Sequence, residues 1–383
     1  MIDLSVVIVN YNARHFLQIC LDALQVALDG INAETIVIDN ISTDDSCAVI
    51  KSQYTWVTLI ENNENVGFGR ANNQGFDIAK GKNILILNPD TIVQKSTLLE
   101  SLELIKNDSK VGAVGVRMLD GSGNFLPESK RGLPTPQTAF YKAFGLSSLF
   151  PKSERYARYY LGHLPEAKTT EIEVLAGAYM MCSAHILKEC AGFDEDFFMY
   201  GEDIDLSYRI TQKGYKNIYL ATAPIIHFKG ESAGRDAVWA QRFYDAMYLF
   251  SEKHFSENGK LYNYLINCGI KFKKIISTSK KISTTKTDLS NLQLTIVSNT
   301  EAKGYDEFSK SFKNVEYHND VQGISIASSA MLFLPDVDKK FIIETMDKYK
   351  SEKQYFFASA DGSFVLSSPS STSQGEIWQI KNK

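Results

Sequence analysis

The feature that most constrains the fold is a regular alternation of apolar runs and helix-period segments in the amino-terminal part of the chain. Residues 4–9 form a continuous apolar run, and residues 13–28 then carry leucine and phenylalanine at helical spacing. The same alternation predicts strands at 34–39, 56–60 and 84–87, a helix that begins at 42–44 and another at 71–79. Strands that alternate with helices through short loops form a mostly parallel sheet. The sequence therefore predicts an α/β fold with a central sheet flanked by helices.

The turn after the first strand excludes a dinucleotide-binding oxidoreductase, although such a fold begins in the same way. A dinucleotide site needs a Gly-x-Gly-x-x-Gly turn, so that the backbone can approach the pyrophosphate closely. Residues 10–14 read NYNAR instead, and the glycine pair at 67 and 69 comes only after a later strand. We therefore expect a different kind of ligand at this sheet.

Carboxylates are crowded among large aromatic side chains in residues 192–209, which read GFDEDFFMYGEDIDLSYR. An acid held beside apolar walls can act as a base near neutral pH. Helix capping is the simpler function for acids at an amino-terminal turn, and it accounts for part of this cluster. Because capping does not explain the preceding aromatic run, we expect acids of this block to take part in catalysis.

Two further segments place polar side chains at strand ends. The apolar run 83–87 ends in Asn88 and Asp90, and a second apolar run delivers His227 just before a polar turn that contains glycine. In open α/β sheets the carboxyl ends of the strands face the ligand crevice. Asp90 and His227 could together hold a divalent metal, Mg²⁺ or Mn²⁺. The alternative for His227 is a strand-end histidine that is satisfied by a backbone carbonyl.

Taken in order, these segments resemble the inverting family-two glycosyltransferases with the GT-A fold, and within them the bacterial rhamnosyltransferase-like branch. The matching segments are VVIVNYN at 6–12, VIDNISTD at 37–44, ENVGFGRANNQG at 64–75, LNPDT at 87–91, GA at 177–178, the acidic block, and HFKGES at 227–232. The resemblance covers roughly the first two thirds of the chain. Members of the family commonly carry Asp-x-Asp where this chain has Asn88-Pro89-Asp90, which removes one charge from the metal position.

The resemblance implies a site for a nucleoside-diphosphate sugar in the early loops. The implied donor-binding residues are Val9, Asn10, Tyr11, Asp39, Asn65, Gly67, Arg70 and Asn88. Asp39 would accept a hydrogen bond from the imino N–H of uracil or thymine. The simpler alternatives are that Asp39 only shapes its turn and that Arg70 is a solvated surface cation.

The resemblance also implies a reaction. The sugar would move to an acceptor hydroxyl in a single displacement with inversion, with Asp203 taking the proton and Glu202 orienting the hydroxyl. The metal would neutralise charge on the departing diphosphate. We expect dTDP-rhamnose first and a UDP-sugar second as donor, and a lipid-linked or polysaccharide acceptor in cell-surface glycan synthesis. Residues 127–164, rich in arginine and tyrosine, would cover the acceptor side.

Two other classes of function are compatible with such a fold. A nucleotide-sugar pyrophosphorylase-like enzyme would carry a glycine-rich loop with lysine and arginine after its first strand, and this chain does not. A non-catalytic nucleotide-sugar-binding subunit would not need Asp203, Asp90 and His227 together. Both alternatives rank below the transferase.

Length and composition predict more than one domain. With 383 residues and 44% hydrophobic content, the chain can bury a full core in one large domain and a smaller one. We expect a catalytic domain at 1–255, a basic and partly helical linker at 256–289, and a small α/β domain of unknown role at 290–383. That last domain is expected to stabilise the protein or to bind a protein partner.

Charge and cysteine content restrict the environment. A net charge of -4 argues against a general nucleic-acid binder, and five scattered cysteines indicate neither a disulfide framework nor a zinc site. We expect a cytoplasmic protein, because no secretory signal or membrane-spanning run is evident. The lysine-rich linker could rest on the inner face of a membrane, although a solvated connector is the commoner role of such a segment.

Overall fold

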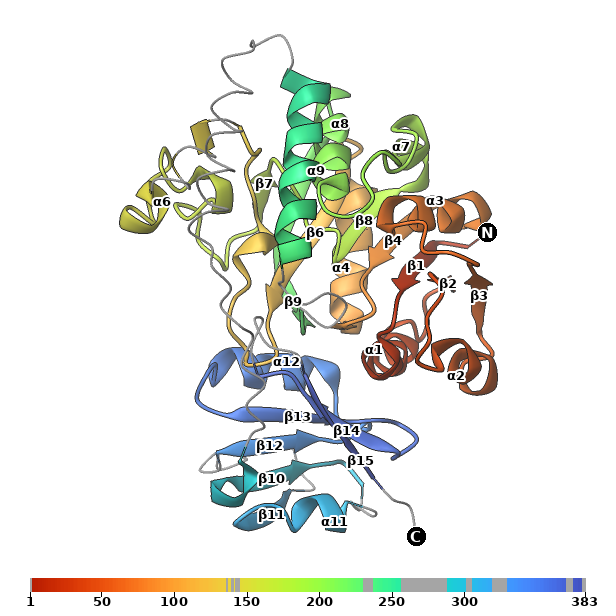
Figure 1. The fold of residues 1–383 in the computed structure, drawn as a ribbon, viewed down its shortest axis with the longest axis vertical. Helices are drawn as coiled ribbons and strands as arrows, with labels where there is room; N and C mark the ends of the chain where they lie inside the picture. The colour runs from red at the N-terminus through yellow and green to blue at the C-terminus, as the bar shows by residue number, and fades with distance from the viewer. Residues whose placement is uncertain are drawn as a thin grey trace.

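The computed structural model describes residues 2–135, 137–138, 141, 145–229, 237–255, 288–300, 305–318, 329–369 and 375–380. Figure 1 shows two sheets, a large one built from the amino-terminal part of the chain and a smaller one near the carboxyl terminus. The large sheet has the strand order β3-β2-β1-β4-β8-β6-β9-β5, and β7 pairs with β9 outside this path.

The predicted alternation of strands and helices is present at the start of the large sheet. Its elements are β1 (Leu4–Asn10), α1 (Arg14–Ala27), β2 (Ala33–Asp39), α2 (Ser46–Gln53), β3 (Val57–Glu61), α3 (Phe68–Ile78) and β4 (Asn83–Leu87). Strand β1 pairs in parallel with β2 and β4, and β2 pairs in parallel with β3. Asn10 and Asp39 are therefore aligned at the carboxyl ends of neighbouring strands.

The second half of the large sheet makes it mixed. Its elements are β5 (Thr91–Ile92), α4 (Lys95–Asn107), β6 (Val111–Leu119), η1 (Pro127–Ser129), α6 (Leu146–Leu149), η2 (Arg158–Tyr160), β7 (Thr170–Ile172), β8 (Tyr179–Ser183), α7 (Ala184–Glu189), α8 (Glu202–Gln212), β9 (Lys216–His227) and α9 (Ala237–Phe255). Strand β8 lies antiparallel between β4 and β6, whereas β6 and β9 are parallel. The carboxyl ends of β1, β4, β6 and β9 therefore meet at one edge.

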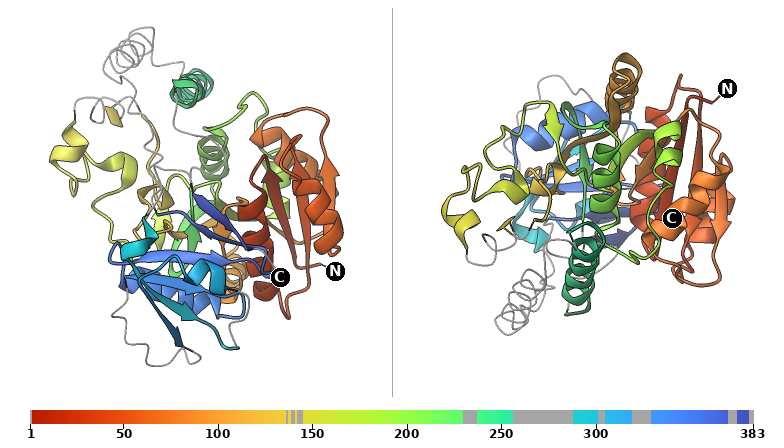
Figure 2. Two further views of the ribbon diagram at one scale, coloured as in Figure 1. Left: turned by 60° about the horizontal axis from the view of Figure 1, so that its bottom comes forward. Right: turned by 90° about the horizontal axis from the view of Figure 1, so that it is seen from above.

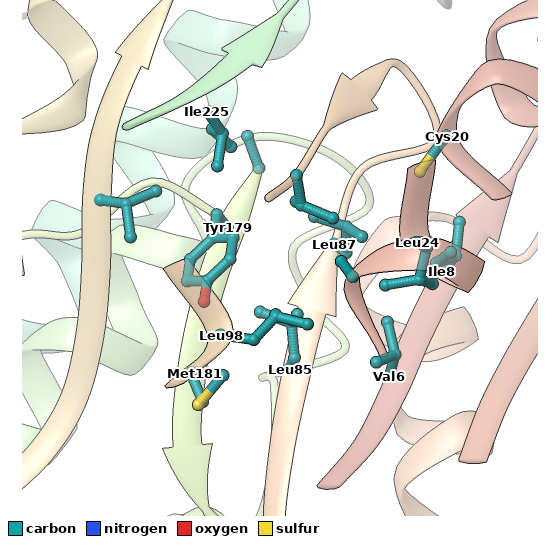
Figure 3. Close-up of a cluster of buried hydrophobic side chains, with 14 of the residues drawn as sticks. Val6, Ile8, Cys20, Leu24, Leu85, Leu87, Leu98, Tyr179, Met181 and Ile225 are labelled. Atoms are coloured by element: carbon teal, nitrogen blue, oxygen red, sulfur yellow. The ribbon is translucent and has the colours of Figure 1, made fainter. Parts of the chain in front are cut away.

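Helices cover both faces of this sheet because its strands are apolar on both sides. Helices α1, α2 and α4 pack on one face, and α3, α7 and α8 pack on the other. Successive side chains of a strand point to opposite faces, so Val6 and Ile8 belong to the first core and Val7 and Val9 to the second. Figure 3 shows part of the first core, with Val6, Ile8, Cys20, Leu24, Leu85, Leu87, Leu98, Tyr179, Met181 and Ile225.

The smaller sheet has the order β11-β10-β12-β13-β14-β15. Its elements are η4 (Leu289–Asn291), β10 (Gln293–Val297), α11 (Asp306–Ser309), β11 (Asn314–His318), β12 (Ala330–Phe333), α12 (Lys339–Lys348), β13 (Gln354–Ala358), β14 (Phe364–Ser367) and β15 (Glu376–Gln379). Strands β10 to β13 are parallel, and β14 and β15 run antiparallel to their neighbours. A second, smaller α/β domain is thus confirmed, and we call it the C-terminal domain (Figure 1).

Some expectations concern residues on which the structure is silent. The predicted linker at 256–289 lies almost entirely within 256–287, outside the described residues. Within the described residues no helix is long and apolar enough to cross a membrane. The described cysteines, at positions 20, 47, 182 and 190, are free thiols.

Candidate functional site

The donor wall expected at the ends of β1 and β2 is built around one buried side-chain pair. The Asn10 amide donates to Asp39 Oδ2 over 2.8 Å, and Asp39 Oδ1 accepts from the backbone N–H of Ser42 over 2.7 Å. Asp39 therefore does shape its turn, as the simpler interpretation expects. Each carboxylate oxygen can accept more than one hydrogen bond, so the same group can also receive a base N–H. Tyr11, the residue after Asn10, is exposed, and Val9, the residue before Asn10, is buried.

The next predicted donor residues lie where α3 begins. Gly67 has φ of 88°, and a Cβ there would lie 2.5 Å from the carbonyl oxygen of Phe198. The close approach that needs this glycine is therefore to the acidic segment 192–209. Asn65 accepts a hydrogen bond from the Gly67 N–H over 3.0 Å. Arg70 lies 3.5 Å from the Glu195 carboxylate in an exposed ion pair, so its role toward phosphate stays a prediction.

The two predicted metal ligands, Asp90 and His227, lie in contact just beyond the carboxyl end of β4. His227 Nε2 lies 3.2 Å from Asp90 Oδ1, and the Asn88 amide lies 3.4 Å from the same nitrogen. A two-residue antiparallel ladder between β5 and β9 creates this contact, because it pairs Thr91 with His227. The Phe228 N–H donates to the Asp90 carbonyl over 2.9 Å and extends the ladder. Both ligand side chains are buried.

The donor atoms at this pair suit a divalent cation. His227 Nδ1 is buried with no hydrogen-bond partner, whereas Nε2 is directed at the carboxylate and the amide. Burial by itself raises the pKa of Asp90, but the imidazole and the Lys229 N–H outweigh it and leave the pKa below its usual value. The carboxylate is thus in the form that binds metals. The described residues contain no group of three or more His, Cys, Asp or Glu arranged to hold a metal, so substrate oxygens and water would have to complete the coordination.

The expected base, Asp203, lies at the start of α8. Its Oδ2 atom accepts from Arg131 Nη2 over 2.5 Å and from the Gly177 N–H over 3.1 Å, and its Oδ1 atom accepts from the Ile204 N–H over 2.8 Å. The helix dipole also favours negative charge at this position. The carboxylate is mostly buried and held in one orientation, which suits proton transfer to a fixed acceptor.

Arg131 is the functional residue whose contact with Asp203 the sequence did not reveal. Its guanidinium is buried, and Nη2 also donates to the Leu175 carbonyl over 2.7 Å. Burial by itself lowers the pKa of Arg131. The interactions with Asp203 and Tyr159 outweigh burial and raise this pKa above its usual value, so the guanidinium stays charged. Sequence reasoning placed Arg131 only in the acceptor-side segment 127–164. The backbone bridge between Arg131 and Val174 brings it to α8, and no local pattern predicts that bridge.

Glu202 differs from its neighbour in having little contact with polar groups. The side chain is buried, and its Oε2 atom has no hydrogen-bond partner. Burial, reinforced by the negative charge of Asp203, raises the pKa of Glu202 to about 8. Glu202 is therefore largely protonated at neutral pH, whereas Asp203 is paired with a cation. This division favours Asp203 as the base, and the orienting role of Glu202 toward an acceptor stays a prediction.

Glu202→Gln should make the stability of the protein less dependent on pH. The pKa of Glu202 is raised above its unfolded value of about 4.3, so the folded protein loses stability as the pH rises from there through about 8. The quantity of interest is the free energy of unfolding of Glu202→Gln minus that of wild type. This difference should be more positive at pH 9 than at pH 5 by on the order of a few kcal/mol, because the amide carries no charge at either pH. Urea unfolding at pH 5, 7 and 9 measures this.

The matched control for this measurement is Glu195→Gln, because Glu195 lies in the same segment with its side chain half exposed. That change should leave the pH dependence of unfolding as in wild type. Identical slopes of unfolding free energy against pH for wild type and Glu202→Gln would contradict the assignment.

A buried ion-pair network holds the acidic segment against its surroundings. Asp205 contacts Arg209 Nη2 over 2.6 Å and His254 Nε2 over 2.6 Å, which ties α8 to α9. Arg209 also donates to the Gly192 carbonyl over 2.9 Å. Asp205 is thus occupied by structural partners. Of the three acids in the first turn of α8, Asp205 is paired with Arg209 and His254, Glu202 has a buried oxygen without a hydrogen-bond partner, and Asp203 is paired with Arg131.

Comparison with known families assigns the amino-terminal part of the chain to a family. Residues 5–184 match the family described as Glycosyl transferase family 2. The chain carries a family 2 glycosyl transferase domain. The GT-A-type mixed sheet flanked by helices is the fold expected for that domain. The match ends before α8 and β9, so the placement of Asp203 and His227 rests on geometry rather than on the family match.

Curated proteins that are similar to this chain are named as glycosyltransferases. The chain is 27% identical over 244 residues to an N-acetylglucosaminyl-diphospho-decaprenol L-rhamnosyltransferase of Mycobacterium tuberculosis, which covers 61% of this chain and 78% of the relative. It is also 27% identical to the low-salt glycan biosynthesis hexosyltransferase Agl10 of Haloferax volcanii (54% of this chain, 61% of the relative). Rhamnosyltransferase WbbL of Escherichia coli K12 is 27% identical as well (42% and 61%).

Solved structures resemble this chain with low sequence identity. S. aureus TarS (residues 1–349) matches with 16% identity and a TM-score of 0.44, covering 72% of this chain and 73% of that one. The mannosyltransferase PcManGT of Pyrobaculum calidifontis matches with 17% identity and a TM-score of 0.45, covering 72% and 76%. No inference about ligands rests on likenesses of this degree.

Proposed function

We propose that this protein is an inverting glycosyltransferase that moves a sugar from a nucleoside-diphosphate donor to an acceptor hydroxyl. The observation that carries the proposal is the separation of roles among its acids. Asp203 is held by Arg131 and Gly177 at the start of α8, while Asp90 is held against His227 at the β5–β9 ladder. Each site has one carboxylate with defined partners. A transferase needs one such carboxylate as the base and another to hold the cation at the diphosphate.

In this proposal Asp203 takes the proton from the acceptor hydroxyl as the new bond forms. The ion pair with Arg131 and the bond from the Gly177 N–H keep the carboxylate turned to one side. A single base suffices for a single displacement with inversion, and no covalent sugar intermediate is needed. Glu202 would orient the acceptor from its buried position.

Asp90 and His227, with Asn88 beside them, would hold a divalent cation, Mg²⁺ or Mn²⁺. Such an ion would neutralise negative charge on the departing diphosphate. Asn10 and Asp39 would hold the pyrimidine base, Val9 and Tyr11 would line it, and Asn65, Gly67 and Arg70 would lie near the sugar and diphosphate. The Asn10–Asp39 hydrogen bond supports this, because it holds Asp39 in place for a base N–H.

The names of the relatives support a choice of donor and acceptor. Two of them are rhamnosyltransferases, so we propose dTDP-rhamnose as the first donor and a UDP-sugar as the second. The mycobacterial relative is named for a decaprenol-linked acceptor, which supports a lipid-linked or polysaccharide acceptor here. A lipid-linked acceptor would require at least peripheral contact with a membrane on the cytoplasmic side.

The proposal is tested by binding and then by turnover. Calorimetry with dTDP, UDP and GDP, each with and without Mn²⁺, should show metal-dependent binding of a pyrimidine diphosphate. Nucleotide release from dTDP-rhamnose and UDP-sugars should then increase when a polyprenyl-diphosphate-linked sugar is added. Folded protein that binds none of the three nucleotides would contradict the proposal. Binding without any turnover would favour the non-catalytic subunit, and diphosphate-forming exchange with a nucleoside triphosphate would favour the pyrophosphorylase-like enzyme.

A further inference from the structure

The C-terminal domain packs against the edge of the large sheet that carries the candidate metal pair. Figures 1 and 2 show this domain in blue beside α1 and the end of β9. One apolar cluster crosses the boundary and joins α1, β5, β6 and β9 to the strands and helix α12 of the C-terminal domain. Its members from the family 2 side are Phe16, Ile19, Ala23, Ile92, Leu119, Ile226 and Phe228. The two sheets therefore share one contiguous hydrophobic cluster.

Phe228 is the residue through which this core reaches the metal pair. Its ring lies 5.1 Å from that of Phe357 and 5.3 Å from that of Phe16, edge-on in both cases. Ile226 and Phe228 flank His227 in the chain, and both are fully buried in the shared cluster. The two neighbours of His227 in the chain are therefore fixed by packing in the core, and one of them, Phe228, packs directly against the C-terminal domain.

The docking of the two domains is fixed by polar and steric contacts as well. Arg117 of β6 makes a two-pronged ion pair with Asp347 of α12, with N–O distances of 2.8 and 2.7 Å. Paired nitrogens and oxygens in this arrangement fix orientation as well as distance. A Cβ at Gly123 would lie 2.0 Å from the Met346 carbonyl oxygen, so the two backbones are in direct contact.

A second contact reaches the donor wall. His15, in the first turn of α1, lies edge-on to Phe364 of β14 with ring centroids 4.7 Å apart. Helix α1 begins directly after the loop 11–13, which contains Tyr11 and follows Asn10 at the end of β1. The C-terminal domain thus touches the segments behind both the nucleotide wall and the metal pair.

We infer that the C-terminal domain is a positioning element of the donor site, with Phe357 fixing His227 through Phe228. The inference rests on the proposed function, because it concerns a cation held by Asp90 and His227. Groups that contact a metal ligand hold it in the binding orientation, and losing one typically costs about 10- to 100-fold in metal affinity or activity. Phe357 acts one residue further out, through Phe228, so we expect an effect at the lower end of that range. Residues 290–383 therefore serve the donor site as well as their own fold.

The test compares two phenylalanines of one strand. Phe357 faces the shared cluster, whereas its neighbour Phe356 faces a separate core of the C-terminal domain with Phe308 and Trp378. Both are buried, at 3% and 0% exposure, so Phe357→Leu and Phe356→Leu remove the same atoms from equally buried positions. Both variants should lower the unfolding temperature. Only Phe357→Leu should weaken the Mn²⁺-dependent binding of dTDP or UDP, by about 10-fold.

The outcomes separate this inference from the proposed function. Wild-type protein that shows no Mn²⁺-dependent binding of either nucleotide overturns the proposed function itself. Wild-type binding that both leucine variants retain, or that both lose equally, overturns the positioning role. If Phe357→Leu does not fold, Phe357→Met, whose unbranched and flexible side chain fills irregular gaps in a core, replaces it with the same expected result.

Discussion

Asp203→Asn should lower the rate of sugar transfer by about 10²- to 10⁴-fold, the range expected for loss of a general base. Asparagine has the shape of aspartate and can still accept the hydrogen bond from the Gly177 N–H, but it cannot take a proton from an acceptor hydroxyl. Metal-dependent nucleotide binding should remain within about twofold of wild type, because binding is not where a base acts. Nucleotide release under saturating donor and acceptor, together with calorimetry, measures both quantities.

The control for this variant comes from the same acidic segment. Asp196→Asn changes a carboxylate whose side chain is 70% exposed and paired with Lys253 on the surface, so it should leave turnover near the wild-type rate. Because Asp203→Asn leaves the buried Arg131 guanidinium without its anion, a thermal melt must accompany the assay. More than a tenth of the wild-type turnover in a folded Asp203→Asn protein would show that another group is the base.

Asp90→Ala should abolish the effect of Mn²⁺ on nucleotide binding, with a loss of at least about 100-fold in the presence of metal. The change removes the only carboxylate in contact with His227 among the described residues, and hard divalent cations depend on carboxylate oxygens. Binding of nucleotide without metal should change little, since Asn10 and Asp39 at the base site are untouched. Calorimetric titrations of dTDP and UDP with and without Mn²⁺ separate the two effects.

Asp108→Ala is the matched control for the metal variant. Asp108 follows α4 and pairs with Lys216 at the start of β9, the end of that strand away from His227. Its removal should not alter metal-dependent binding. Equal Mn²⁺ dependence in Asp90→Ala and wild type would exclude Asp90 as a ligand.

The sequence predicted those elements whose signal is local. Periodicity alone indicates β1 to β4 with their helices, because a strand or amphipathic helix carries its pattern within a few residues. Helix α3 begins at Phe68 rather than at the predicted 71, since the left-handed backbone at Gly67 turns the chain directly into the helix. The sequence also predicted that Asp90 and His227 lie close together, because both follow apolar runs that end at one edge of the sheet.

What the sequence by itself determined is thus the order of the early strands, the division into two α/β parts and the set of acids and imidazole available for chemistry. Only the tertiary structure decided that β8 is inserted antiparallel between β4 and β6, that Arg131 pairs with Asp203, and that Phe357 packs against Phe228, the residue after His227. The physical reason is range. Periodicity and capping act over a few residues, whereas these contacts join residues far apart in the chain, and their partners are selected by the packing of the whole core.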